Sequence, residues 1–235
     1  MAQNGPPPSL LDYVLEDFNQ DRESRTSRAL ILFQSDRAEE THDWNAFVES
    51  KTKEAVVTGF MLHINQVACA ILIESQTNII LEVIRILCGR PDCNAKVCLF
   101  NEEVVREYPM WQGREAKIIS EPDITINNLL PAVFDVHRGL LELGVEARAT
   151  GDGIKARDLL LGNKPQVLAR IPSAERVQAL LATDLCTVAE YLDMYDAPVE
   201  FTFDSERVWP AENPLEVCSV FCCVSIPCLR RHCSV

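Results

Sequence analysis

The sequence lacks the features that mark membrane-spanning and secreted chains. No stretch approaches the ~18 consecutive apolar residues expected of a membrane span. Residues 1–9 are polar and rich in proline, with no basic start and no apolar run before Leu10, so they do not resemble a secretory signal. We therefore expect a cytoplasmic protein without an integral membrane segment, whose ten cysteines are mostly reduced thiols.

Positive charge is scarce in this chain. Lys and Arg number 22 against 35 Asp and Glu, which gives a formal net charge of −13. Such a surface repels phosphate backbones, so we expect neither nucleic acid nor an anionic membrane as a general partner. A basic protein surface would be attracted instead, although acidic soluble proteins without such a partner are common. The 235 residues, 47% of them hydrophobic, suffice for one sizeable core or two small ones.

Recognisable catalytic and metal-binding patterns are also missing. The four histidines lie far apart in the sequence. His63 ends an apolar run, which favours a buried, hydrogen-bonded side chain over a ligand. Gly151-Asp-Gly153 lacks the Lys and Ser/Thr of a phosphate loop and is typical of a turn. No Ser-His-Asp or Cys-His set is proposed from the spacing. We therefore expect no enzymatic activity and no bound metal.

Cysteine is concentrated at the end of the chain. Three interpretations are open for this tail: a segment with no task, a metal site that includes His232, or acylation of Cys222 and Cys223 next to Arg230-Arg231. The spacing is not the paired Cys-x-x-Cys of a structural zinc site. The five cysteines of the tail are Cys218, Cys222, Cys223, Cys228 and Cys233.

Composition and periodicity divide the chain into four segments. In the first segment, helical spacing of apolar residues predicts a short amphipathic helix that packs either on the body of the chain or on a partner. The apolar residues of this helix include Leu11, Val14, Leu15 and Phe18. The segments are a Pro-rich leader (1–27), a compact α+β domain (28–120), a helical extension closed by a strand (121–210) and the cysteine-rich tail (211–235).

The compact domain has a readable order of elements. Asp43 is expected to cap the first helix, Asn65-Gln66 to form a turn between two strands, and Gly89 with Pro91 to end the second helix. A β-α-β-β-α-β order is that of a ferredoxin-like sandwich, with two helices on one face of an antiparallel sheet. The expected strands are 29–33, 56–63, 66–73, one within 95–105 and a fifth over 116–120; the expected helices are 42–53 and 77–87.

Packing elements are expected in the extension. Apolar residues from Ile126 to Leu141 predict a helix that closes over the sheet, and Ser173 is a good cap for a second helix. A third helix is expected after Asp184 or Thr187. The alternation of Val199, Phe201 and Phe203 with polar residues predicts a strand. Trp209, which follows it, is expected to pack against the body of the chain.

Three segments of the compact domain resemble a known photoreceptor family. Val57-Thr58-Gly59, Ile73-Glu74-Ser75 and Arg106-Glu-Tyr-Pro-Met-Trp111 are similar to segments of the BLUF domain, a blue-light sensor that uses FAD. The resemblance implies a BLUF-like variant of the ferredoxin-like fold. It also implies where a flavin would be held.

The flavin positions implied by this resemblance do not carry the required groups. The family has a tyrosine where this chain has Phe33 and a glutamine where it has Ile71. The asparagine that holds the flavin ring corresponds to Lys51 or Thr52. Phe33 has no hydroxyl, and Ile71 can neither donate nor accept a hydrogen bond. We therefore expect a BLUF-like fold that has lost flavin binding and has no cofactor.

The end of the extension resembles a second family. Leu192-Asp-Met-Tyr195, followed by Asp196-Ala-Pro-Val-Glu-Phe-Thr-Phe-Asp-Ser-Glu-Arg-Val-Trp-Pro210, is similar to the end of the chain in the testis-expressed protein 47 family. With the BLUF-like segments, this resemblance covers most of residues 29–210. It implies a motile cilium or sperm flagellum as the setting, and other proteins of an axonemal assembly as partners.

These observations lead to one main hypothesis and two alternatives. We expect a non-enzymatic protein-interaction component of the ciliary or flagellar axoneme. The alternatives are a flavin-binding sensor and an adaptor tethered to a membrane through Cys222 and Cys223. The candidate contact regions are the sheet edge and the apolar terminal residues Leu11, Val14, Leu15, Phe18 and Trp209.

Overall fold

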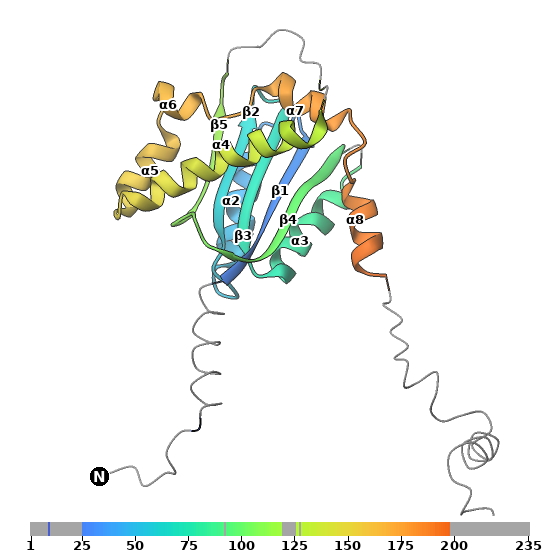
Figure 1. The fold of residues 1–235 in the computed structure, drawn as a ribbon, viewed down its shortest axis with the longest axis horizontal. Coiled ribbons are helices and arrows are strands. Elements are labelled where there is room, and N and C mark those ends of the chain that lie inside the picture. Colours follow the sequence, from blue (N-terminus) through green and yellow to red (C-terminus); the bar gives the residue numbers. More distant parts are fainter. Residues whose placement is uncertain (1–8, 10–24, 92, 119–125, 127, 198–235) are drawn as a thin grey trace, which may run out of the picture. The chain divides into compact units, whose positions relative to one another are not determined.

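The computed structural model describes residues 9, 25–91, 93–118, 126 and 128–197 (Figure 1). The predicted leader helix, the strand over 199–203, Trp209 and the cysteine tail lie outside these residues. The elements, in chain order, are β1 (Arg25–Gln34), α2 (Glu40–Lys51), β2 (Thr58–Ile64), β3 (Ala68–Ser75), α3 (Thr77–Cys88), β4 (Ala95–Val105), β5 (Trp111–Ala116), α4 (Leu129–Ala149), α5 (Gly153–Leu161), α6 (Pro165–Leu168), α7 (Ala174–Leu181) and α8 (Val188–Tyr195).

The described strands form one five-stranded sheet of order β4-β1-β3-β2-β5. β1 lies between β4 and β3 and runs antiparallel to both, β2 is antiparallel to β3, and β5 is parallel to β2. The fold is therefore α+β with a mixed, open sheet. The β-α-β-β-α-β order expected from the sequence is present, and the arrangement is consistent with a ferredoxin-like fold.

The fifth strand was predicted in the wrong place. β5 spans Trp111–Ala116, whereas the fifth strand was expected to begin at residue 116. The N–H of Gly59 donates to the carbonyl of Met110 at 3.1 Å, and Gly59 then pairs with Trp111. This bond brings the chain into the sheet five residues earlier than the apolar pattern indicated.

The turn between β2 and β3 was predicted correctly. Asn65 and Gln66 both have positive φ, 50° and 59°, as a tight hairpin turn requires. Asparagine tolerates this backbone conformation better than most residues. The Asn65 side chain also accepts from the N–H of Ile118 at 2.9 Å and donates to its carbonyl at 3.0 Å. The turn therefore also holds the chain where it leaves β5.

One face of the sheet packs against α2, α3 and α8. Alternate residues of each strand point to this side, as the period of two in a strand requires. In α3, residues at helical spacing complete the core, which is why the apolar run 77–87 was recognisable as a helix. Buried residues of this first core include Ala29, Ile31, Phe33, Trp44, Met61, Cys69, Ile71, Ile73, Ile80, Ile84, Leu87 and Val188.

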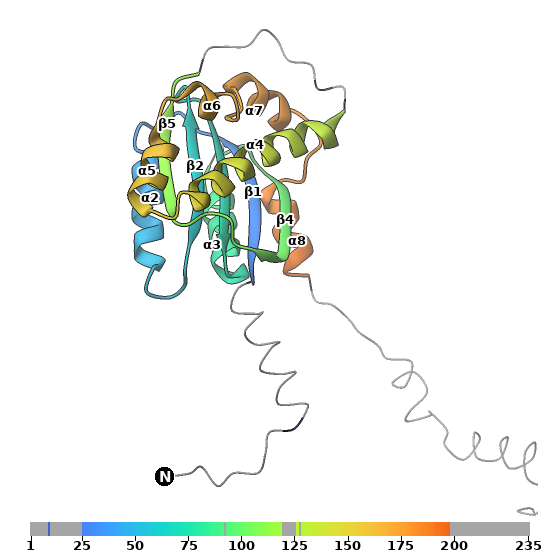
Figure 2. The ribbon, with the colours of Figure 1, turned by 60° about the vertical axis from the view of Figure 1, so that its left-hand side comes forward.

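The other face of the sheet is covered by α4, α5 and α7, so the sheet is the middle of three layers (Figures 1 and 2). The prediction that the helix after Ile126 closes over the sheet is confirmed. Tyr108 extends this core by stacking on Phe60 with ring centroids 6.3 Å apart. Buried residues of this second core include Leu30, Leu32, Phe60, Leu62, Leu72, Tyr108, Val133, Val136, Leu140, Leu143, Leu160, Val177 and Leu180.

The helix caps partly match the sequence predictions. Ser173 caps α7, accepting from the N–H of Arg176 at 3.2 Å, as expected. Asp43 does not cap α2, because that helix begins three residues earlier at Glu40 and Asp43 instead pairs with Arg37 at 2.5 Å. The Gly151-Asp-Gly153 turn connects α4 to α5, and the Asp152 side chain accepts from the N–H of Ile154.

α8 is the helix that was expected after Asp184 or Thr187, and Thr187 is the residue that caps it. Thr187 Oγ1 accepts from the N–H of Glu190 at 3.1 Å, and Glu190 Oε2 accepts from the N–H of Thr187 at 2.8 Å. This reciprocal pair is a capping box. Just before it, the carbonyl of Cys186 accepts from the N–H of Val97 at 2.9 Å. The chain thus returns to β4 and covers part of its outer edge.

No helix among the described residues is long and apolar enough to cross a bilayer.

Candidate functional site

Two of the four positions implied for flavin contact lie together in the first core. Phe33 on β1 and Ile71 on β3 are fully buried on the face that packs against α2 and α3. Phe33 makes an edge contact with the ring of Trp44, with centroids 6.3 Å apart, and Met61 pairs across the strands with Ile71. Aromatic and aliphatic side chains therefore occupy the layer between these strands and the helices.

The other two positions, Lys51 and Thr52, lie where α2 ends. Lys51 Nζ pairs with Glu82 of α3 at 2.9 Å and with Glu54 at 3.3 Å. The hydroxyl of Thr52 donates to the carbonyl of Glu49 at 2.8 Å. Their polar groups tie α2 to α3 and close the last turn of α2. Neither residue supplies the amide that the resemblance calls for.

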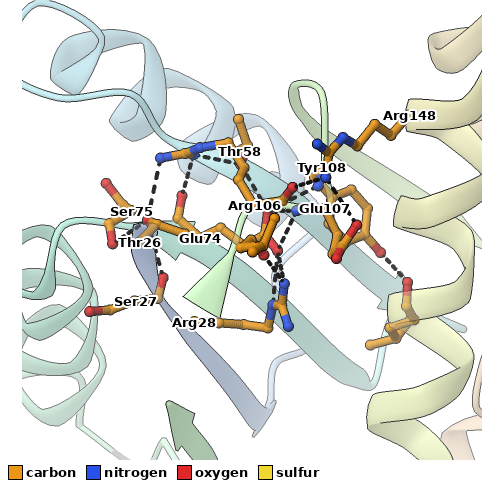
Figure 3. A network of polar contacts seen from close by, with 12 residues as sticks. Thr26, Ser27, Arg28, Thr58, Glu74, Ser75, Arg106, Glu107, Tyr108 and Arg148 are labelled. Carbon is orange, nitrogen blue, oxygen red and sulfur yellow. Dashed lines mark hydrogen bonds and ion pairs between the residues drawn. The ribbon is translucent and has the colours of Figure 1, made fainter. Parts of the chain in front are cut away.

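The structure brings the other BLUF-like segments together around Glu74 (Figure 3). The Glu74 side chain is fully buried at the end of β3. Its carboxylate accepts from Arg28 Nε at 2.8 Å and from Thr58 Oγ1 at 3.1 Å. It also accepts the backbone N–H groups of Glu107, at 3.0 and 3.1 Å, and of Tyr108, at 2.9 Å. These donors replace the water that a carboxylate loses on burial.

Two arginines complete this network. Arg28 reaches from β1 and also donates to the carbonyl of Val105 at 2.7 Å. Arg106 donates to Thr58 Oγ1 at 2.7 Å and to the carbonyl of Glu74 at 3.2 Å. Burial lowers the pKa of Arg106, and the Glu74 charge opposes that shift. The network joins β1, β2 and β3 to the segment between β4 and β5.

Tyr108 extends the contact to α4. Its hydroxyl donates to the carbonyl of Leu140, and Arg148 Nη1 donates to the carbonyl of Arg106 at 2.6 Å (Figure 3). Burial and the nearby Glu74 charge raise the pKa of Tyr108 well above its ordinary value. The phenol therefore stays neutral and acts as a fixed hydrogen-bond donor. The arrangement is a structural lock, since the Glu74 carboxylate, the Arg28 guanidinium and the Tyr108 hydroxyl all bond to other protein groups.

A second buried carboxylate, Glu40, lies beyond the other end of β1. It accepts from Ser35 Oγ at 2.7 Å, from Trp44 Nε1 at 2.7 Å and from Arg90 Nη1. Burial alone would raise the pKa of Glu40, but the hydrogen bonds from Arg90 and Ser35 outweigh it and the pKa is lowered. The Arg90 guanidinium also lies over the Trp44 ring, 5.1 Å from its centroid. This cluster fixes the β1–α2 connection.

His63 lies on the same side of the sheet as this cluster. It is fully buried, and its Nε2 lies 3.1 Å from the carbonyl of Ser35. Its Nδ1 has no hydrogen-bond partner among the described residues. The expectation of a buried histidine is therefore confirmed, but only one of its two ring nitrogens is satisfied.

A hollow of about 610 Å³ borders the Glu40 cluster. Arg37 and Arg90 line it, but both already pair with Glu40, and Arg37 also pairs with Asp43. Burial raises the pKa of the Cys93 thiol, so this residue is not an activated nucleophile. Within the described residues no three His, Cys, Asp or Glu side chains are grouped so as to hold a metal ion.

Sequence reasoning missed the polar centres of the fold. Glu74 and Arg106 were recognised as matching residues, but their contact was not foreseen, and Glu40 and Arg90 were not singled out. The burial of such residues is hard to predict from the sequence, because a charged residue is normally expected to be exposed. The predicted contact residues Leu11, Val14, Leu15, Phe18 and Trp209, and the candidate lipidation sites Cys222 and Cys223, all lie outside the described residues.

No family model matches the chain. No curated protein matches it at a significant level.

Proposed function

We propose that this chain is a non-enzymatic protein-interaction module built on a BLUF-like ferredoxin sandwich that does not bind flavin. The observation that carries the proposal is the complete burial of Phe33 and Ile71 against Trp44 and Met61. A flavin ring held between these strands and helices would have to displace side chains that are already close-packed. Neither Phe33 nor Ile71 offers it a hydrogen bond in return.

The strand order supports the BLUF-like part of the proposal. The antiparallel order β4-β1-β3-β2 is that of a ferredoxin-like sheet, and β5 is added parallel to β2. The contacts among Thr58, Glu74 and the 106–108 segment give the shared residues a structural role that needs no cofactor. These residues are thus compatible with a fold that keeps the packing of a BLUF domain but holds no flavin.

The setting we propose is an axonemal assembly in a cilium or sperm flagellum. The resemblance of residues 192–210 to testis-expressed protein 47 supplies this setting. Tagged protein expressed in ciliated cells is expected to co-purify with axonemes after detergent extraction. Tagged protein that is excluded from cilia would remove the setting but leave the interaction module.

Flavin retention tests the loss of the cofactor site. Purified protein is incubated with FAD or FMN, desalted and examined by visible absorption. We expect no retained flavin band, either for the wild type or for the double variant Phe33→Tyr/Ile71→Gln, since Trp44 and Met61 still fill the layer. A wild-type protein that stays yellow after desalting would overturn the proposal in favour of a flavin-binding sensor.

A further inference from the structure

α4 carries a second apolar surface that does not face the sheet. The helix buries one side in the second core through Val133, Val136, Leu140 and Leu143. Residues on the adjoining outward side are nevertheless large and apolar. The exposed fractions are 67% for Leu130, 54% for Phe134 and 47% for Val145. Leu141 lies between them, is half-buried and also packs against the second core. We call Leu130, Phe134, Leu141 and Val145 the outer stripe of α4.

The outer stripe is continuous along the helix. At 100° per residue its four members fall within about 60° of the helix circumference, so they form one narrow band. Asp135, Arg138 and Glu142 lie along one border of this band and are exposed. In Figure 1, α4 lies in front of the sheet, and no labelled helix or strand passes in front of it. The described part of the chain therefore leaves the outer stripe open to a partner.

The spacing of the outer stripe is the same when read from either end of α4. Leu130 and Phe134 are four residues apart, Phe134 and Leu141 are seven apart, and Leu141 and Val145 are again four apart. An interface around a twofold axis makes residue i meet residue j while j meets i, so this spacing lets every apolar residue of the stripe meet another apolar residue. Two antiparallel copies of α4 would place Leu130 against Val145 and Phe134 against Leu141. The twofold axis makes each of these contacts occur twice.

The charges beside the outer stripe agree with the same arrangement. Asp135 and Arg138 are paired within one chain at 2.8 Å, and both are exposed. In the antiparallel register, Arg138 of one copy comes level with Arg138 of the second copy to within about 1.5 Å along the helix axis, and with Asp135 of the second copy to within about 3 Å, because each residue adds 1.5 Å. The two Asp135 carboxylates therefore balance the two Arg138 charges at this border. The paired spacing of the outer stripe, which an unrelated apolar segment would leave unused, is what favours a second copy of the chain.

We propose that two copies of this chain associate through the outer stripes of their α4 helices, packed antiparallel about a twofold axis. This inference deepens the proposed interaction function and rests on it. A patch of four side chains per copy is small for a protein interface, so the association is reversible, with a dissociation constant on the order of 1–100 µM.

Sedimentation velocity of the full chain over a concentration series tests the proposal. The wild type is expected to shift from monomer to dimer as concentration rises. Leu130→Glu and Val145→Lys are each expected to weaken the association about tenfold or more. The double variant Leu130→Glu/Val145→Lys places Glu opposite Lys at both ends of the interface, and is expected to associate more tightly than either single variant.

The matched control is Ile154→Glu on α5, an apolar residue that is 74% exposed and lies off the outer stripe. It is expected to leave the association unchanged, and circular dichroism checks that every variant is folded. A wild type that stays monomeric, single variants that associate like wild type, or a double variant no tighter than the single ones would each overturn the proposal. None of these results bears on flavin retention, so the two proposals fail separately.

Discussion

Arg28 Nε donates to Glu74 Oε1 at 2.8 Å, inside a network where the Glu74 side chain has no exposure to water. Breaking a buried ion pair by removing one partner leaves the other charge uncompensated, which costs more than the pair contributes when intact. Glu74 also fixes two backbone N–H groups between β4 and β5. The Glu74 side chain therefore helps to place the segment that leads into β5.

Glu74→Ala is accordingly expected to destabilise the fold by about 3–5 kcal/mol, measured by urea unfolding. The loss reflects the stranded Arg28 charge and the unpaired N–H groups of Glu107 and Tyr108. Glu49→Ala, an exposed site on α2, is the control and should change the unfolding free energy by less than about 0.5 kcal/mol. Equal effects at the two sites would contradict the structural role assigned to Glu74.

Glu40 gives the fold a specific response to acid. Its pKa is lowered in the folded state, so its contribution to stability is complete above the unfolded pKa of about 4.3 and is lost as the pH falls through the lower, folded value. Glu40→Gln is expected to cost about 2 kcal/mol at pH 7 and to flatten the decline in stability below pH 4.3. Unfolding free energies of variant and wild type across this range provide the check. Parallel pH curves would refute it.

Gly59 is required by both its backbone and its neighbours. Its φ is +139°, and a Cβ there would lie 2.2 Å from the carbonyl oxygen of Leu72. Gly59→Ala is expected to cost about 3 kcal/mol or more, because backbone must move. Gly151 also has positive φ, +61°, but open space around it, so Gly151→Ala should cost only about 1–2 kcal/mol. Thermal unfolding of the two variants should show this order, and the reverse order would count against the β2–β3 packing.

The cysteines of the described part should differ in reactivity. Burial raises the pKa of Cys98 to about 12, so almost no thiolate forms at neutral pH, whereas Cys88 is exposed. Alkylation at pH 8, followed by mass spectrometry of the peptides, is expected to modify Cys88 at least about 100-fold faster than Cys98. Under unfolding conditions the two rates should converge. Similar rates in the native protein would show that Cys98 is not protected by the fold.

Local patterns in the sequence were sufficient for much of this fold. β4 spans Ala95–Val105, the range within which a strand was predicted, α3 follows its apolar face, and Ser173 caps α7 as expected. Each of these depends on spacing or capping within a few residues. Such signals survive in a single sequence because the neighbours that matter are close along the chain.

The elements that were missed depend on distant partners. β5 has the sequence Trp-Gln-Gly-Arg-Glu-Ala, which carries no apolar alternation, and it is placed by Gly59 and Glu74 instead. The burial of Glu40 needs Ser35, Trp44 and Arg90 to converge, which no local rule reveals. Likewise, periodicity placed Phe134 in a helix without showing that it points away from the sheet.

β1 lies inside the sheet, and the two strands that pair with it both follow it in the sequence. Leu30 pairs with Leu72 on one side and with Leu99 on the other, so both neighbours of β1 are made after it. During synthesis the apolar run 29–33 has no strand to pair with until β3 has emerged, and no second one until β4 has. Contacts over such separations close slowly. A nascent chain halted before residue 95 would present one edge of this apolar strand to the cell, where chaperones or aggregation compete for it.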